Sequence, residues 1–411
     1  MPVPLSARLL LGGLLLCAAA GATCVSAEEN PGAPVASALA PFTDRHAVAG
    51  VVAGVYSRTG GQLCLVASGS SDLAAGTAMR TDALFWVASM SKPMTATALM
   101  MLVDEDKVHL DDPVERYLPE FRGQQLAVKQ DGLVVLKSPA HPITVRNILS
   151  HTSGLPFASR VESPAGFKVD IFPLQAQVIS YALTPLKTEP DSAYDYSNAG
   201  INTAGRIIEV VSGMPYEEFM AARLFRPLGM VDTTLWPDEA QVHRLAKSYR
   251  PNQAKDALDE ITVDQLSYPL GNHRRGPSPS GGYFSTAADI GRFARMILCG
   301  GALDGKRYLS EASLRAMTST QAGGRLNDPA RANGYGLGWS TEAKDTPGIG
   351  SAPLAPCGHG GAYATNLRID PQHGLALIYM VQHAGFILDG AQAHGAFEKA
   401  AIAAFAQPAQ P

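Results

Sequence analysis

Strand-like segments at both ends of the chain, separated by a long helical region, constrain the fold most. Near the start, two apolar runs at 51–56 and 63–66 flank a Gly-Gly turn and predict a β-hairpin. Near the end, residues 367–369 and 375–379 predict a second pair of strands around a short turn. We therefore expect a discontinuous α/β domain, in which helices flank an antiparallel sheet built from both chain ends, with an inserted, mostly helical domain.

The predicted boundaries follow the changes in this pattern. A chain of 411 residues is long enough for two packed parts. The folded domain is expected over residues 28–405, with its α/β part at about 40–88 and 280–405 and its helical part at about 89–279. Residues 406–411 are expected to form a short tail.

Local patterns predict several individual elements. Apolar residues at helical spacing predict helices over about 89–104 and 391–405, and Thr144 is a predicted helix N-cap. The segment 28–45, rich in Ala, Pro and Ser, is expected to be the lead-in of the mature chain. The polar, Pro-rich segment 237–279 predicts loops.

The first 27 residues have the pattern of a secretory signal peptide. Arg8 precedes an apolar run at 9–22, and small residues follow at 25–27, which predicts cleavage after Ala27. The apolar run is shorter than the roughly 20 residues that span a bilayer, which disfavours the alternative of an uncleaved anchor. We expect an exported protein, periplasmic or secreted, without a membrane span after the signal is removed.

Cys64, Cys299 and Cys357 remain after the predicted cleavage. An oxidising compartment permits one disulfide, but an odd count leaves at least one thiol, and the sequence does not identify the pair.

Composition and missing motifs exclude several classes of function. The formal net charge is −4 and the basic residues are scattered, so nucleic acid is not an expected partner. The chain has no His-x-His or His-Glu-x-x-His cluster, which disfavours a metal site, and no Gly-x-Ser-x-Gly elbow, which disfavours an α/β-hydrolase. We expect no cofactor.

Ser89 and Lys92 form a Ser-x-x-Lys motif at the start of a predicted helix. Residues three apart lie on one helical face, so the lysine amine can reach the serine hydroxyl. A serine is a weak nucleophile until a neighbour removes its proton, and a lysine can do so when burial or nearby positive charge lowers its pKa. The motif alone is weak evidence, because an ordinary surface pair has the same spacing.

Tyr196 and Asn198 lie in a Tyr-Ser-Asn motif further along the chain. A phenol has a reference pKa of about 10, and a nearby ammonium group would stabilise its phenolate. Tyr196 is therefore a candidate to take the Ser89 proton or to return a proton to the leaving group. Asn198 offers donors and acceptors to a substrate amide or ester. The alternative for this motif is a turn with a packed tyrosine.

A Gly-His-Gly-Gly segment contains His359, Gly360 and Gly361 and is followed by Ala362. Its glycines would let a substrate approach the backbone closely at a strand edge. The backbone N–H of Ala362 is a candidate to join that of Ser89 in an oxyanion hole. The alternative for the histidine is a structural role.

These three motifs, in this order, resemble the family of class C β-lactamases, related DD-peptidases and β-lactamase-like esterases. Similar segments extend the resemblance over roughly residues 50–385: Phe85-Trp86-Val87-Ala88, 149–155, 227–230, 280–286 and 334–339. The resemblance implies a β-lactamase/transpeptidase-like fold. It also implies an acyl-enzyme on Ser89, base chemistry by Lys92 and Tyr196, and substrate positioning by Asn198 and the strand 359–362.

The chain departs from the family pattern in two places. Class C β-lactamases usually have Lys-Thr-Gly where this chain has His359-Gly360-Gly361. A lysine offers a fixed positive charge to the substrate carboxylate, whereas a histidine with a reference pKa near 6.5 is mostly neutral at pH 7. The smaller departure is Asp191, where family members often have glycine. His151 lies in a segment that is structural in this family, and we do not expect it to be the catalytic base.

The sequence thus predicts an exported serine hydrolase that cleaves ester or amide bonds through an acyl-serine intermediate, with a carboxylesterase as the leading interpretation. Its expected partner is a small-molecule ester, amide or β-lactam. The alternatives are a class C-like β-lactamase or a DD-peptidase, and a penicillin-binding sensor module that forms an acyl adduct without turnover. The oligomeric state and the physiological substrate are left open.

Overall fold

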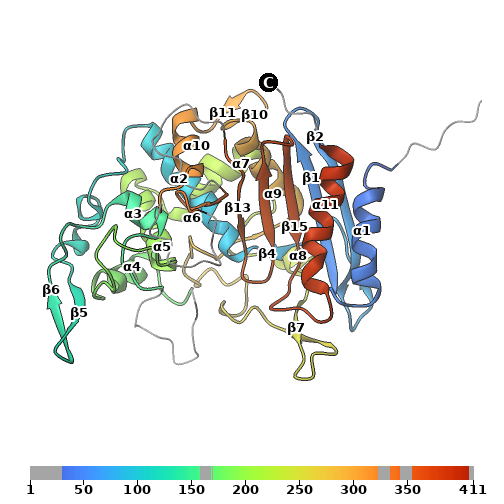
Figure 1. The fold of residues 1–411 in the computed structure, drawn as a ribbon, viewed down its shortest axis with the longest axis horizontal. Helices are drawn as coiled ribbons and strands as arrows, with labels where there is room; N and C mark the ends of the chain where they lie inside the picture. Colours follow the sequence, from blue (N-terminus) through green and yellow to red (C-terminus); the bar gives the residue numbers. More distant parts are fainter. Residues whose placement is uncertain (1–29, 158–167, 169, 323–333, 343–353, 407–411) are drawn as a thin grey trace, which may run out of the picture. The chain divides into compact units, whose positions relative to one another are not determined.

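The computed structural model describes residues 30–157, 168, 170–322, 334–342 and 354–406 (Figure 1). The predicted signal peptide and its cleavage site lie outside the described residues, as does the tail beyond residue 406. The chain divides into two units, Met1–Asn30 and Pro31–Pro411. The described helices and strands all belong to the second unit. The boundaries between an α/β part and a helical part stay a prediction.

A seven-stranded antiparallel sheet joins the two ends of the chain (Figure 1). The N-terminal hairpin pairs with the C-terminal hairpin through β1 and β15, with Val52 opposite Met380 and Val55 opposite Leu377. The sheet drawn from both chain ends is therefore confirmed. In sheet order the strands are β12 (Ser340–Thr341), β13 (Cys357–Gly360), β14 (Asn366–Asp370), β15 (Leu375–Met380), β1 (Gly50–Ser57), β2 (Gly61–Asp72) and β3 (Thr77–Ala78).

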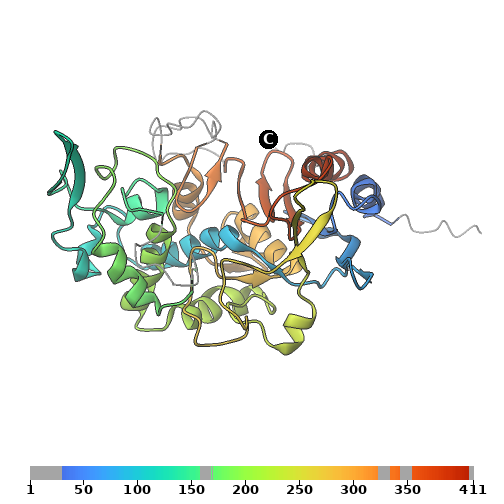
Figure 2. The same cartoon turned by 90° about the horizontal axis from the view of Figure 1, so that it is seen from below.

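Helices cover both faces of this sheet, and strand alternation explains how. Successive side chains of β15 point to opposite faces, so Leu377 joins the cluster under α1 (Ala33–Asp44) and α11 (Ala393–Phe405). Ile378 joins the large core that includes α9 (Ala287–Leu298). Figures 1 and 2 both show α1 and α11 side by side.

The segment 28–45, expected as a lead-in to the mature chain, contains the helix α1. Val35 and Leu39 are four residues apart, so they lie on one face of the helix, and both are completely buried. The Ala-rich composition of this segment favours a helix when its apolar face packs against another element, and here that element is α11.

The centre of the fold is a helical region around α2 (Ser91–Asp104). Every residue from Ser91 to Leu102 is buried, as expected for a helix surrounded by other elements. Predicted caps are present: Thr144 accepts from the Asn147 N–H at the start of α3. The other α-helices are α3 (Val145–Ser150), α4 (Leu174–Ala182), α5 (Asn198–Ser212), α6 (Tyr216–Met220), α7 (Arg226–Leu228), α8 (Glu239–His243) and α10 (Glu311–Thr318).

Two hairpins and a short helix were not predicted. The segment 237–279 contains α8 and the hairpin of β7 (Ser248–Pro251) and β8 (Leu258–Ile261) rather than loops alone. A capping box between Asp238 and Gln241 stabilises the start of α8. A second hairpin, β5 (Leu126–Gln130) and β6 (Leu133–Lys137), projects from the helical region in both views.

Within the described ranges, no helix has the length and apolar character that a bilayer span requires. The same residues contain no cluster of His, Cys, Asp and Glu that could hold a metal ion. Cys64, Cys299 and Cys357 are free thiols, so the structure forms none of the disulfides that the sequence left open.

Candidate active site

The backbone leading into Ser89 is held in place by segments distant in sequence. Strand β4 (Phe85–Trp86) pairs with β9 (Phe284–Ser285). The Trp86 indole N–H donates to the Gly281 carbonyl at 2.7 Å, and the Val87 N–H donates to the Tyr283 carbonyl at 3.0 Å. The serine is therefore attached to a rigid part of the fold, as a nucleophile requires.

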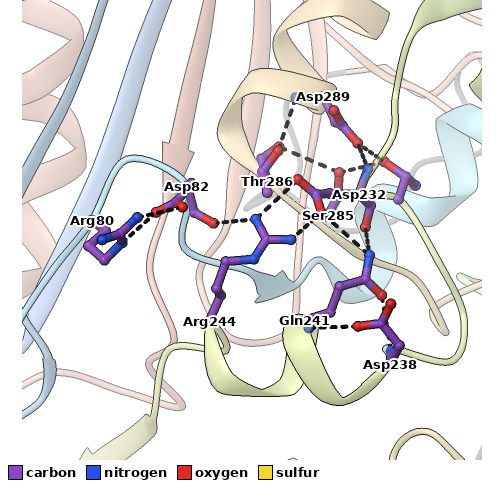
Figure 3. A network of polar contacts seen from close by, with 10 residues as sticks. Arg80, Asp82, Asp232, Asp238, Gln241, Arg244, Ser285, Thr286 and Asp289 are labelled. Atoms are coloured by element: carbon purple, nitrogen blue, oxygen red, sulfur yellow. Dashed lines mark hydrogen bonds and ion pairs between the residues drawn. The ribbon is translucent and has the colours of Figure 1, made fainter.

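A polar network braces the same segment from the side (Figure 3). Arg244 donates to the Asp82 carbonyl at 3.0 Å and forms an ion pair with Asp232. Asp232 is tied in turn to the start of α9, because its N–H donates to the Asp289 carboxylate at 2.8 Å. The Asp289 N–H donates to the Thr286 hydroxyl, which is the N-cap of α9.

The α-helix begins two residues later than predicted, so Ser89 lies in the turn before it. It belongs to a 3-10 turn at Ala88–Met90, and the α-helix begins only at Ser91. The preceding Ala88 has φ 45°, a left-handed conformation that costs energy in a non-glycine residue. Ser89 is partly exposed between its buried neighbours, so its hydroxyl is accessible.

Lys92 lies directly beside this hydroxyl. Its Nζ is 3.0 Å from Ser89 Oγ, 2.8 Å from Asn198 Oδ1 and 2.8 Å from the Ser280 carbonyl oxygen. The side chain is fully buried, and this burial lowers the pKa of the amine well below its ordinary value.

The three partners of Lys92 define what the neutral amine does. Asn198 Oδ1 and the Ser280 carbonyl are acceptors only, so they bind the two N–H groups of a neutral amine. The remaining lone pair then faces Ser89 Oγ and is able to accept its proton. Burial and hydrogen bonding together would allow Lys92 to act as a base for Ser89.

Tyr196 lies on the loop just before α5 and completes the predicted trio. Lys92 Nζ is 4.7 Å from the centroid of the Tyr196 ring. Ser197 caps α5 by accepting from the Gly200 N–H, which fixes the backbone next to the tyrosine. The three side chains at positions 89, 92 and 196 therefore share one site.

His151 supports this site by packing against Tyr196 and by binding the backbone of Ser197. The residue is buried, and its Nδ1 accepts from the Ser197 N–H at 3.1 Å. Its ring centroid lies 4.5 Å from that of Tyr196 and 4.6 Å from that of Tyr335. These contacts agree with the prediction that His151 is structural.

His359 lies on β13, and both of its ring nitrogens have protein partners. Nδ1 lies 2.8 Å from the Gly360 carbonyl oxygen, so Nδ1 carries the proton in the neutral ring. Nε2 lies 3.2 Å from the Tyr335 hydroxyl and accepts from it. The histidine is 7% exposed. Its ring lies beside that of Tyr196, with ring centroids 6.2 Å apart.

Gly361 brings the turn after β13 against the segment before Ser89. A Cβ at this position would lie 2.6 Å from the Val87 carbonyl oxygen and 2.1 Å from Thr365 Oγ1. Only glycine permits this approach. Ala362 follows on an exposed turn, where its N–H is the predicted second donor of the oxyanion hole. Gly360 is different, because its Cβ would meet nothing closer than 3.7 Å.

Two participants were missed as site residues. The Ser280 carbonyl binds Lys92, and Tyr335 binds His359 and packs on His151. The only sequence signal for either was its place in a segment that resembles the family. A backbone carbonyl has no side-chain signature, and the position of Tyr335 is decided by packing.

Fold and site together define a class: the serine hydrolases of the β-lactamase/transpeptidase type. Known proteins narrow this further. The family model described as Beta-lactamase matches residues 35–400, and the chain belongs to that family.

Several known proteins are similar over most of the chain. Penicillin-binding protein 4 of Amycolatopsis lactamdurans is 32% identical over 332 residues, which cover 80% of each chain. Esterase EstB of Burkholderia gladioli is 29% identical over 354 residues, covering 80% of this chain and 85% of the esterase. The solved structure of EstCE1, a hydrolase with promiscuous acyltransferase activity, is 23% identical. It has a TM-score of 0.71 and covers 90% of this chain and 98% of its own, which shows the shared fold.

Proposed function

We propose that this protein is an exported carboxylesterase that acts through an acyl-enzyme on Ser89. The observation that carries the proposal is the buried Lys92 amine, 3.0 Å from Ser89 Oγ, with its other two contacts made to acceptors. The similarity to esterase EstB supports the choice of an ester.

In the proposed mechanism, Lys92 takes the hydroxyl proton while Ser89 Oγ attacks the substrate carbonyl carbon. The oxyanion that forms accepts from the N–H groups of Ser89 and Ala362. The C–O bond to the alcohol breaks, and the proton returns to the leaving oxygen through Tyr196. A water molecule then attacks the acyl carbonyl, losing its proton to the same Lys92–Tyr196 pair, and releases the acid and free Ser89.

The environment of His359 favours an ester over a β-lactam. A β-lactam carries a carboxylate, which a fixed positive charge would bind. Here the position holds His359, whose reference pKa near 6.5 makes a histidine mostly neutral at pH 7, and its ring nitrogens contact the Gly360 carbonyl and the Tyr335 hydroxyl. A neutral ester has no carboxylate, so its binding does not require a positive charge at this position.

A substrate panel tests the proposal: p-nitrophenyl esters, nitrocefin and a D-Ala-D-Ala peptide, each with the wild type and Ser89→Ala. We expect ester turnover that Ser89→Ala abolishes while circular dichroism and melting stay unchanged. Ser138→Ala, at an exposed serine, is the matched control and should keep full activity. Faster turnover of nitrocefin or the peptide would replace the esterase by the corresponding alternative, and acylation without turnover would indicate a sensor module.

A fluorophosphonate probe tests the nucleophile separately. Mass spectrometry should find the adduct on the peptide that contains Ser89. Labelling of another serine in the active protein would refute the assignment.

Export is the remaining part of the proposal, and it rests on the N-terminal pattern at 1–27. Mass spectrometry of the protein from the medium or periplasm should find Glu28 as the first residue. Intact protein that begins at Met1 and stays in the cytoplasm would refute it.

A further inference from the structure

Helix α5 carries two buried asparagines on the side that faces Lys92. Asn198 and Asn202 are four residues apart, so they lie on one face of the helix. Asn198 binds the lysine amine directly, with its Oδ1 2.8 Å from Nζ. Asn202 is 2% exposed and binds Ser280, the residue that supplies the other acceptor of this amine. The second asparagine is therefore one residue removed from the base.

The hydrogen bonds of Asn202 define the orientation of its amide. Its Oδ1 accepts from the Ser280 N–H at 3.0 Å, and a backbone N–H can only donate, so the oxygen must be on this side. Its Nδ2 lies 3.0 Å from the Tyr181 hydroxyl and 3.4 Å from Gln177 Oε1. Ser280 is fully buried, so removing the Asn202 amide would leave its N–H without a partner, at a cost in free energy.

The peptide group that joins Pro279 to Ser280 is held at both ends. Its N–H donates to Asn202, and its carbonyl, that of Pro279, accepts from the Thr95 hydroxyl at 2.7 Å. A peptide group is planar, so two hydrogen bonds at opposite ends fix its orientation. The Ser280 carbonyl belongs to the next peptide group, and the two groups share the Ser280 Cα. Holding the first group therefore restricts where the Ser280 oxygen can lie.

Close packing leaves this segment little room to shift. A Cβ at Gly205, further along the same helix, would lie 2.3 Å from Pro279 Cγ, so the helix and the segment are in direct contact. The Gly281 N–H, which shares a peptide group with the Ser280 carbonyl, donates to the Ser278 carbonyl at 3.1 Å. The direction of the Ser280 carbonyl is thus set by the segment's attachment to its surroundings.

We propose that Asn202 is a positioning residue for the Lys92 base, because it holds the Ser280 carbonyl oxygen 2.8 Å from Nζ. Helix α5 then controls both acceptors of the neutral amine, one directly through Asn198 and one through Ser280. With two N–H groups engaged in this way, the lone pair of the amine is directed at Ser89 Oγ. The inference rests on the proposed function, in which Lys92 removes the Ser89 proton.

The alternative is that Asn202 only satisfies the buried polar groups around it. That role would affect stability and would leave the titration of Lys92 unchanged. A carbonyl oxygen stabilises an ammonium group more than a neutral amine, so displacing the Ser280 oxygen should lower the pKa of Lys92. Lys92 acts as a base when neutral, so the rise in rate with pH would then move to lower pH. The pH profile of the Ser89 reaction separates the two roles.

The rate at which a fluorophosphonate labels Ser89, followed by mass spectrometry from about pH 4 to about pH 10, tests the proposal. We expect Asn202→Leu, an apolar side chain of similar size, to slow labelling about tenfold or more and to move its acidic limb to lower pH by about half a unit or more. Tyr181→Phe is the matched control, because it removes the hydroxyl beside Asn202 Nδ2 and leaves Oδ1 on the Ser280 N–H. It should lower the melting temperature and leave the limb unmoved.

Two further variants make the outcome decisive. Asn202→Asp keeps an oxygen for the Ser280 N–H, so above its limb labelling should stay within about threefold of the wild-type rate, and the limb should not move to lower pH. Thr95→Val keeps the shape of the side chain and releases the Pro279 end of the same peptide group, so its limb should move to lower pH. This variant tests the proposal if circular dichroism shows that Asn202→Leu does not fold.

The possible results point in different directions. An unmoved limb in folded Asn202→Leu, or in Thr95→Val if the former does not fold, would overturn the proposal and leave the proposed function standing. So would an Asn202→Asp variant that loses as much rate as Asn202→Leu. Wild-type protein that is not labelled at Ser89 would overturn the proposed function, and the role of Asn202 with it.

Discussion

His151 holds the backbone next to Tyr196 through one hydrogen bond: its Nδ1 accepts from the Ser197 N–H at 3.1 Å. The same ring packs on Tyr196 with centroids 4.5 Å apart. His151 thus positions a tyrosine whose ring lies 4.7 Å from the Lys92 amine. This separation of positioning from proton transfer makes the role of His151 testable.

His151→Asn should lower kcat about tenfold and leave the shape of the pH–rate profile unchanged, because Lys92 sets that profile. Asparagine tolerates the left-handed φ of 60° at this position and keeps a side-chain acceptor. Steady-state kinetics from pH 5 to 10 measure both effects, and His141→Asn, at an exposed histidine, is the control. Loss of the acidic limb in His151→Asn would make His151 the base instead.

Asn198→Asp should move the acidic limb of kcat/KM to higher pH by about one unit or more. Lys92 acts as a base when neutral, so activity rises as the pH passes through its pKa. A carboxylate in place of the amide, whose oxygen lies 2.8 Å from Nζ, stabilises the ammonium form and raises that pKa. Asn198→Ala adds no charge and serves as the control. An unmoved limb in Asn198→Asp would exclude Lys92 as the titrating group.

Gly361→Ala should lower kcat about 100-fold or more, because its Cβ collides with the Val87 carbonyl and displaces the proposed oxyanion hole. Gly360→Ala, one residue earlier, is the matched control, since its Cβ would only make ordinary contacts. Kinetics and melting of the two variants separate them. Equal activity of the Gly361→Ala and Gly360→Ala variants would show that this turn is not part of the active site.

The free energy of unfolding should fall as the pH rises from about 4 to about 6, because Asp289 loses its proton in this range. Burial raises the pKa of this carboxyl from 3.8 to about 6, although it accepts from the Asp232 N–H and Thr233 (Figure 3). The stabilisation by the protonated Asp289 carboxyl is complete below the pKa that this group has in the unfolded chain. It is lost as the pH rises through the pKa that the group has in the folded protein. The loss is on the order of 2–3 kcal/mol. Urea unfolding of wild type and Asp289→Asn measures it, and a difference that does not vary with pH would contradict the expectation.

Much of the fold was predictable because its signals are local. Alternating strands at both ends, the Ser-x-x-Lys spacing and the Thr144 cap depend on residues within a few positions of one another. Two local signals were missed. Segment 28–45 forms a helix because it packs against α11. The Asp131-Gly132 pair between two apolar runs is typical of a hairpin turn, and it was overlooked as a signal for the β5–β6 hairpin.

The sequence by itself predicted that Ser89 and Lys92 lie within reach of one another, since residues three apart share one face of a helix. Only the tertiary structure lowers the pKa of that lysine, because it buries the amine. Its burial and its two acceptors come from Asn198 and Ser280, 106 and 188 positions away. Desolvation of a group depends on the residues that surround it in space, and these residues cannot be identified from their spacing along the chain.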